Sequence, residues 1–122
     1  MNQKTIPEEI LLKLGSNINI EELLNRRKLR FPIYIESPIM NDDISELELS
    51  VRSQNCLRRV GYHTVGDLVK NIEKSDDLLK IRNCGENSAR EIMKHLFLHQ
   101  YSVLSTEMQK RWLEELVKLN MR

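Results

Sequence analysis

Hydrophobic residues recur at helical spacing in most parts of the chain, and glycines or small polar residues separate the resulting segments. Near the N-terminus, "TIPEEILLKLG" predicts a short helix with Thr5 as its cap and Gly15 at its end. The next segment, "INIEELLNRRKLR", predicts a second helix that runs to about Lys28. Asn19 is the expected cap of this helix, with Glu22 at the third helical position of a capping box.

A β-branched and aromatic stretch follows these two helices. Residues 31–38, "FPIYIESP", lie between two prolines, which favour extended backbone and exclude a helix interior. We therefore expect an extended arm here, either an edge strand or a segment packed on the domain, and a domain boundary at Pro38.

Three short helices are expected in the middle of the chain. The stretch "LSVRSQNCLRRVG" predicts a helix of about ten residues that is capped by Ser50 and stops at Gly61. In "HTVGDLVKN", Thr64 and Asp67 have the spacing of a capping box. The segment "SDDLLKI" predicts a very short helix with Ser75 as its cap.

A bend of small polar residues precedes the next predicted helix, which spans about residues 86–99. In "IRNCGENSAREI", Asn83 tolerates positive φ, Gly85 is expected to adopt a conformation that a side chain would block, and Ala89 allows two helices to approach closely. The free N–H groups at the helix start, together with the hydroxyl of Ser88, are suited to a phosphate. A plain corner between two helices is the alternative interpretation.

The last segment predicts an amphipathic helix after Ser105. In "TEMQKRWLEELVKLN", the apolar residues Met108, Trp112, Leu116 and Leu119 lie on one helical face. Such a face has to be buried, either against the rest of the chain, which we favour, or against a second copy of the chain in a homodimer.

Composition indicates an ordinary globular domain. The chain has 122 residues, of which 40% are hydrophobic and 30% charged, with a formal net charge of +1. This charge gives no argument for nucleic-acid binding by the whole molecule. The sequence has no apolar run of the ~18 residues that cross a membrane and no signal-peptide pattern, so we expect no membrane association and a cytoplasmic location.

The residues that commonly bind metals lack the usual spacings. Cys56 and Cys84 are too few for a disulfide framework and are expected to be reduced. Together with His63, His95 and His99, they form no recognisable zinc pattern, so we expect neither a metal site nor a cofactor. No paired carboxylates, nucleophile–base pair or nucleotide loop indicates an enzyme.

Residues 37–96 resemble a known family. The segments "ELELSVRSQNCL", "TVGDLV" and "LLKIRNCGENSAREI" appear in the order, and nearly the spacing, of the C-terminal domain of the bacterial RNA polymerase alpha subunit. The resemblance implies an all-α fold: a compact four-helix domain of the helix-hairpin-helix type at residues 38–104. Around it we expect an N-terminal helical extension with an arm (1–37) and a C-terminal amphipathic helix (105–122).

The resemblance also implies a DNA-binding surface. In the family this domain grips the minor groove of A·T-rich DNA, and the arginine that enters the groove corresponds to Arg52. Because a narrow A·T minor groove concentrates negative potential, it attracts an inserted guanidinium. The expected DNA-binding residues are Arg52, Asn55, Cys56, Gly85, Asn87, Ser88 and Glu91, with Arg58, Arg82 and Arg90 as additional phosphate contacts. Gly85, Ser88 and Glu91 match family positions that either contact the DNA backbone or hold the arginine in place.

The sequence departs from the family pattern at the hairpin. Glu86 and Asn87 stand where the family often has basic residues, which weakens the expected DNA contact. The sequence in front of the resemblance is not an assembly domain, so we expect a stand-alone protein rather than an alpha subunit. The basic run Arg26, Arg27, Lys28 and Arg30 is either an extension of the DNA footprint or a solvated helix end.

Two functions follow from the sequence. The first is a regulator of transcription that binds A·T-rich double-stranded DNA. The alternative is a protein–protein adaptor that binds RNA polymerase, a sigma factor or a transcription regulator without strong DNA binding.

Overall fold

The computed structural model describes residues 6–15, 18–26, 28–30 and 38–120. Helices dominate this part of the chain, and its residues form no strand beyond an isolated bridge between Asp43 and Thr64. The expected all-α class is therefore confirmed. The predicted extended arm at residues 31–37 lies outside the described residues. The elements are α1 (Glu8–Leu14), α2 (Ile20–Leu24), η1 (Pro38–Asn41), η2 (Ile44–Leu47), α3 (Val51–Arg59), α4 (Val65–Asn71), η3 (Ser75–Lys80), α5 (Glu86–Val103) and α6 (Thr106–Asn120), where η denotes a 3-10 helix.

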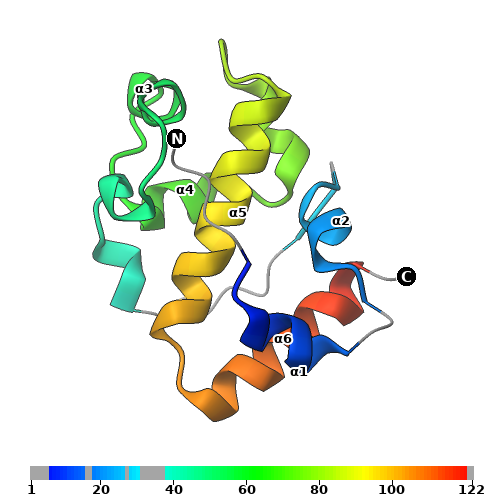
Figure 1. Cartoon of the computed structure of the whole chain (residues 1–122). Helices are drawn as coiled ribbons and strands as arrows, with labels where there is room; N and C mark the ends of the chain where they lie inside the picture. The colour runs from blue at the N-terminus through cyan, green and yellow to red at the C-terminus, as the bar shows by residue number, and fades with distance from the viewer. Residues whose placement is uncertain (1–5, 16–17, 27, 31–37, 121–122) are drawn as a thin grey trace.

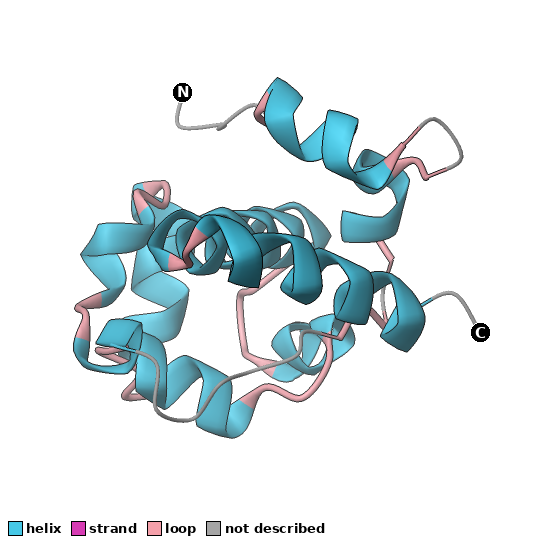
Figure 2. Ribbon diagram, turned by 90° about the horizontal axis from the view of Figure 1, so that it is seen from below, coloured by secondary structure: helices cyan, strands magenta, loops and turns pink. Residues whose placement is uncertain are grey.

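Helix α5 is the central element of the fold (Figure 1). The N-terminal helix α2, the short helices η2 and η3, and α3 all pack against it. Helix α4 packs on η1, and α1 packs on α6 near the C-terminal end of α5 (Figure 2). The two terminal additions thus surround the same long helix as the central segment.

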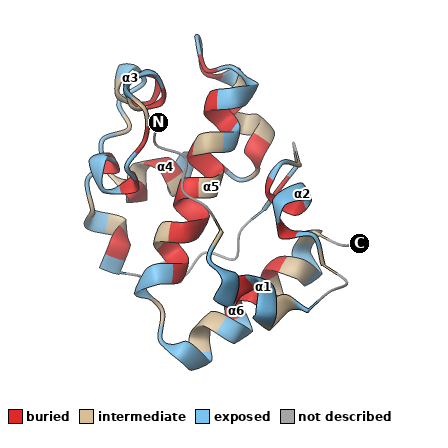
Figure 3. Cartoon of the chain, in the orientation of Figure 1, coloured by how far each residue is buried: buried red, intermediate tan, exposed pale blue. Residues whose placement is uncertain are grey.

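One continuous apolar core joins the extensions to the central segment (Figure 3). Ile10 of α1 and Leu24 of α2 are fully buried in it. Trp112 of α6 is also fully buried and stacks on Phe97 of α5, with 5.1 Å between the ring centroids. The middle of the apolar stripe, Trp112 and Leu116, is therefore buried within its own chain, in agreement with the interpretation that we favoured, while Leu119 at its end stays partly exposed.

Two helix ends differ from the prediction. Helix α2 stops at Leu24 rather than near Lys28, because Leu29 turns inward to a fully buried position and its carbonyl accepts the Ser75 amide at 2.9 Å. Helix α5 continues to Val103, past the expected end at His99, because its apolar face remains buried as far as Tyr101.

The capping predictions were partly right. The Thr64 hydroxyl accepts the Asp67 amide at 3.0 Å, and Asp67 in return accepts the backbone N–H groups of His63 and Thr64, which lowers the pKa of its carboxyl. Asn19 likewise accepts the Glu22 amide.

Two predicted caps were wrong or lie outside the described residues. Thr5 is outside them, and Pro7 occupies the N-cap position of α1. Ser75 is not a cap but the first residue of η3. Asp77 has the capping role there, since its carboxylate accepts the backbone N–H groups of Glu73 and Lys74.

Two of the three histidines connect α5 to the 3-10 region before α3. The buried His95 ring contacts the Leu47 carbonyl through Nδ1 at 2.7 Å, and Nε2 of His99 lies 2.9 Å from the Asp42 carboxylate. These contacts connect α5 to the 3-10 region at residues 38–47. Within the described ranges, we find no helix with the length and apolar character needed to span a bilayer.

Candidate nucleic-acid interface

The first turn of α3 presents Arg52 to solvent. Ser50 caps the helix by accepting the Ser53 amide at 3.3 Å, and the turn contains no acidic residue. Both Val51, which is 76% exposed, and Arg52 lie on the outside. Asn55, one turn further on, is also exposed. Arg52 makes no ion pair or hydrogen bond with any described residue, so its guanidinium is available to a partner.

A carboxylate from α5 fixes the start of α3. Glu91 accepts the Ser50 amide at 3.2 Å and the Ser50 hydroxyl at 2.7 Å, and it also accepts the Ser53 hydroxyl. Glu91 therefore uses both of its oxygens within the protein, which fits the role of holding the arginine in place better than a direct contact with the DNA backbone. Its geometry is that of a positioning residue, which holds the helix turn that bears Arg52 against α5.

The bend before α5 is fixed to α3 by a second contact. The thiol of Cys56 donates to the Asn83 carbonyl at 3.0 Å. Cys56 and Cys84 are both buried free thiols. Burial, and next the neighbouring Cys56, raise the pKa of the Cys84 thiol to about 11, so Cys84 stays protonated at neutral pH.

The unusual backbone conformation in the bend belongs to Asn83, not to Gly85. Asn83 has φ of 68°, whereas Gly85 has φ of −80° and ψ of 179°, which any residue adopts. A Cβ built on Gly85 meets no described atom within 4 Å. Our expectation that Gly85 supplies a special conformation was therefore wrong. Its missing side chain matters only to a molecule that approaches from outside.

The N-terminus of α5 is open. Gly85 is the N-cap and has no side chain to act as an acceptor, while its carbonyl accepts the Ala89 amide. Among the described residues, the amides of Asn87 and Ser88 have no acceptor. Asn87 is exposed, but Ser88 is only 7% exposed, so its hydroxyl is less accessible than the sequence suggested. Open amides and the helix dipole together favour an anion at this position.

Arg58 has a partner inside the protein. Its Nη2 lies 2.8 Å from the Asp43 carboxylate. Hydrogen bonds from Ser45, and next the contact with Arg58, lower the pKa of Asp43 to about 2. This arginine connects the end of α3 to the region before η2 and is a weaker candidate for phosphate than the sequence suggested.

The other two predicted phosphate contacts lie nearer the bend. Arg82 is exposed and has no ion pair with a described residue. Arg90 lies 3.5 Å from the Glu86 carboxylate, one helical turn away. Of the three additional arginines, Arg82 is thus the most available to an external anion.

Comparison with known proteins identifies the family. Residues 35–97 match the family of C-terminal domains from the alpha subunit of bacterial RNA polymerase. The protein belongs to this family. It is similar to the DNA-directed RNA polymerase subunit alpha of Carboxydothermus hydrogenoformans, with 36% identity over 101 residues, which cover 74% of this chain and 31% of the relative. The corresponding subunit of Thermotoga maritima is 48% identical over 60 residues, 49% of this chain and 17% of the relative.

The chain spans about a third or less of the length of these relatives. No solved structure matches it significantly. The resemblance drawn from the sequence is confirmed, and the family supports a DNA-binding role in transcription. The alpha C-terminal domain is a non-catalytic part of the polymerase.

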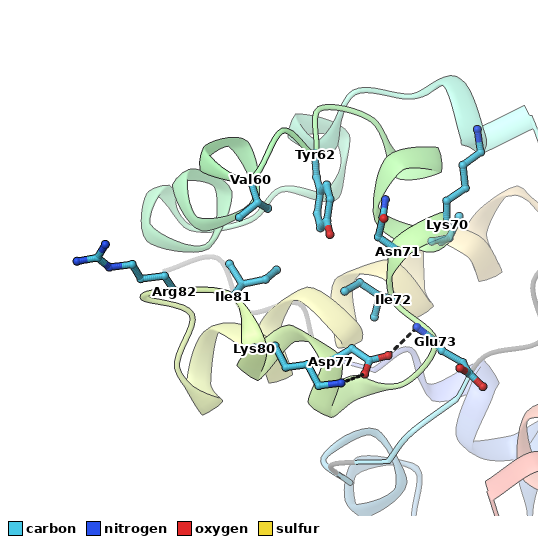
Figure 4. A pocket seen from close by; sticks show the side chains of 11 residues that line it. Val60, Tyr62, Lys70, Asn71, Ile72, Glu73, Asp77, Lys80, Ile81 and Arg82 are labelled. Atoms are coloured by element: carbon cyan, nitrogen blue, oxygen red, sulfur yellow. Dashed lines mark hydrogen bonds and ion pairs between the residues drawn. The ribbon is translucent and has the colours of Figure 1, made fainter.

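A broad groove lies beside the bend of this alpha C-terminal domain (Figure 4). It has a volume of about 800 Å³ and lies between the end of α3, α4 and η3. In Figure 4, Arg82 extends away from the groove at one end. Its charged side chains have both signs, and Lys80 lies 3.2 Å from the Asp77 carboxylate. The apolar lining comes from Val60, Tyr62, Val69, Ile72 and Ile81, and the charged residues are Lys70, Lys80, Arg82, Glu73 and Asp77.

Three positions in the site were not recognised from the sequence. Ser50 and Ser53 both contact Glu91, and the Asn83 carbonyl is the acceptor for Cys56. The two serines flank Arg52 at the start of a predicted helix, which is the signal that could have marked them. The Asn83 contact joins residues 27 positions apart, and no local pattern reveals it.

Proposed function

We propose that the chain is a DNA-binding protein of transcription that acts in the cytoplasm and binds the minor groove of A·T-rich double-stranded DNA. Arg52 would enter the groove, with Asn55 beside it, and the amides at the start of α5 would hold a backbone phosphate. One observation supports this function best. Arg52 is exposed and has no partner among the described residues, and Glu91 holds the helix turn that bears it against α5.

The expected mode of recognition depends on groove width. A narrow A·T minor groove has an enhanced negative potential, so one inserted guanidinium discriminates between sequences without base-specific hydrogen bonds. Gly85 lets a phosphate approach the backbone, because no Cβ stands between the phosphate and the amides. The rigid connection between α3 and α5 would set the spacing between the inserted Arg52 and the phosphate site.

A titration of two labelled duplexes tests this function. One duplex contains an A·T tract and the other is G·C-rich, and each is measured by fluorescence anisotropy at two salt concentrations. We expect tighter binding to the A·T duplex and a steep decrease in affinity with salt. Arg52→Ala should weaken A·T binding by about 5- to 150-fold, equivalent to about 1–3 kcal/mol, and remove most of the preference.

The matched control is Arg111→Ala, which removes an exposed arginine from α6. It makes the same change in net charge and should leave the A·T preference intact. If Arg52→Ala and Arg111→Ala bind alike, Arg52 does not read the groove.

A second candidate function is a protein–protein adaptor, and the groove in Figure 4 favours it. Its apolar lining suits a partner segment with apolar side chains. Lys70 and Arg82, which have no ion pair with a described residue, are available to an acidic side chain of that partner. Glu86 at the start of α5 also reduces the attraction of that helix end for phosphate. Undetectable DNA binding at low salt, combined with binding of purified RNA polymerase, sigma factor or a transcription regulator, would support the adaptor.

We propose that the chain is a monomer. A homodimer through the C-terminal helix was the alternative use of its apolar stripe, but Trp112 and Leu116 are fully buried within the chain. Leu119, with 38% of its surface exposed, is the large apolar residue that α6 still offers to solvent among the described residues. A mass of one chain in solution is expected, and a concentration-dependent dimer would contradict this proposal.

A further inference from the structure

A second group of cations lies outside the segment that matches the family. Arg26, Lys28 and Arg30, from the connection after α2, surround a hollow of about 320 Å³ together with Leu119 and Asn120 at the end of α6. Lys28 and Arg30 are exposed, and Arg26 is half-buried. No described carboxylate lines the hollow, and none of the three cations has an ion pair with a described residue. We call these three residues the basic segment.

The backbone of the basic segment is held in place on two sides. The Asn120 side chain accepts the Arg30 amide and donates to the Arg30 carbonyl, both at 2.9 Å. The buried Leu29 accepts the Ser75 amide through its carbonyl. The positions from which Lys28 and Arg30 extend are thus fixed by contacts to α6 and η3, which lowers the entropic cost of binding an anion there.

Stabilisation of a helix end accounts for only one of these cations. Arg26 donates from Nη1 to the Asn120 carbonyl at 2.6 Å, so it neutralises the C-terminal end of α6. The side chains of Lys28 and Arg30 make no hydrogen bond with a described residue. Their charges therefore have no structural role among the described residues and are available to an external anion.

The basic segment begins beside the N-terminus of α5. Asn25, immediately before it, lines one hollow with Glu86 and Arg90 and another with Asn87. Three residues of extended chain reach at most about 11 Å. The Cα atom of Lys28 therefore lies within about 11 Å of the Cα atom of Asn25, which itself faces the start of α5 across these hollows.

We propose that the basic segment is a second phosphate-binding site, which contacts the backbone of the same duplex that the start of α5 holds. It would replace, from outside the family domain, the positive charge that α5 lacks at Glu86 and Asn87. The proposal rests on the proposed DNA-binding function. Because the net charge of the chain is only +1, DNA binding has to depend on such local clusters.

The test measures how affinity depends on salt in the full chain. Each lost phosphate contact should reduce the slope of log K against log salt by about 0.9, so Lys28→Ala/Arg30→Ala should reduce it by nearly two. Affinity should decrease to a similar extent for A·T-rich and G·C-rich duplexes, because phosphate contacts do not read sequence. The matched control, Lys110→Ala/Arg111→Ala on α6, removes two exposed cations and should keep the wild-type slope.

Further measurements separate the outcomes. The variant Lys28→Arg/Arg30→Lys preserves both charges and should have the wild-type slope of log K against log salt. Hydroxyl-radical footprinting should show a group of backbone positions that Arg52→Ala still protects and that Lys28→Ala/Arg30→Ala no longer protects. If the wild type binds DNA and depends on Arg52, but the double variant matches its control, the second site is refuted and the proposed function stands. If the wild type binds no DNA, both are refuted.

Discussion

Replacement of Gly85 by alanine separates folding from DNA binding in this chain. Gly85 has backbone angles that alanine adopts, and the added methyl group meets no described atom within 4 Å. Alanine is a poorer N-cap than glycine, which costs about 0.5–1 kcal/mol of stability. Alanine also restricts the conformations of the unfolded chain, which stabilises the folded protein by about 0.4–1 kcal/mol and offsets that cost. We therefore expect the melting temperature to change by no more than about 2 °C.

DNA binding should respond quite differently to Gly85→Ala. The methyl group would stand where a phosphate approaches the amides of Asn87 and Ser88. Loss of one charge-assisted hydrogen bond costs about 1.5–3 kcal/mol, which is about a 10- to 150-fold decrease in affinity. Fluorescence anisotropy with an A·T-rich duplex measures the affinity, and circular dichroism measures the melting temperature of the same sample.

Gly61→Ala is the matched control and should give the opposite result. Gly61 has φ of 88°, in the left-handed region, so alanine there costs about 1–2 kcal/mol of stability. Its melting temperature should fall by about 4–8 °C, while the affinity of the folded protein for DNA stays the same. If Gly85→Ala binds DNA within twofold of the wild type, no phosphate approaches the backbone at this bend, and our account of the α5 N-terminus is wrong.

Four further outcomes are expected from stability and binding measurements. Glu91→Gln should lower the free energy of unfolding by about 1–3 kcal/mol in urea titrations, because the start of α3 loses its charged hydrogen-bond acceptor. The same variant should reduce the preference for A·T-rich DNA, and an unchanged preference would exclude a positioning role for Glu91. Trp112→Ala should cost about 3–5 kcal/mol in the same titration, because it removes a fully buried ring, and a cost below about 1 kcal/mol would show that α6 is not part of the core. Gly66→Ala should cost about 1–3 kcal/mol, since a Cβ there would lie 2.6 Å from the Met40 carbonyl oxygen, and an unchanged melting temperature would contradict the close contact of α4 with η1. The free energy of unfolding should decrease as pH rises from about 9 to 11, because the pKa of the Cys84 thiol is raised in the folded state. The thiol therefore loses its proton at lower pH in the unfolded chain than in the folded one. Cys84→Ala should remove this part of the pH dependence.

Local patterns predicted where most helices begin. Ser50, Thr64 and Asn19 all accept the backbone N–H that their positions implied, because a cap is decided within three or four residues of the chain. The same patterns failed at Ser75, where Asp77 accepts the amides instead. Both residues are suitable caps by type, but Ser75 is already the first residue of η3, and its amide donates to the distant Leu29 carbonyl.

The candidate functional residues were found largely through family resemblance, and the contacts then showed which of them have partners inside the protein. Glu91 and Arg58 have partners inside the protein, whereas Arg52 and Arg82 have none among the residues that the structure describes. A sequence pattern records which residue types are present but not which of them pair with each other. Since a paired charge is less available to a ligand than an unpaired one, the pairing determines which residues can bind DNA.

By itself the sequence determined the helical class, the helix order, most caps and the family. These properties depend on neighbouring residues or on a run of matching positions. Only the tertiary structure decided that the helix turn bearing Arg52 is held against α5, through contacts between residues about 40 positions apart. It also decided that Asn25, which precedes the basic segment, shares a hollow with the start of α5. Such contacts form only when separate helices share a core, because the burial of side chains such as Leu29 and Trp112 determines which distant segments become neighbours.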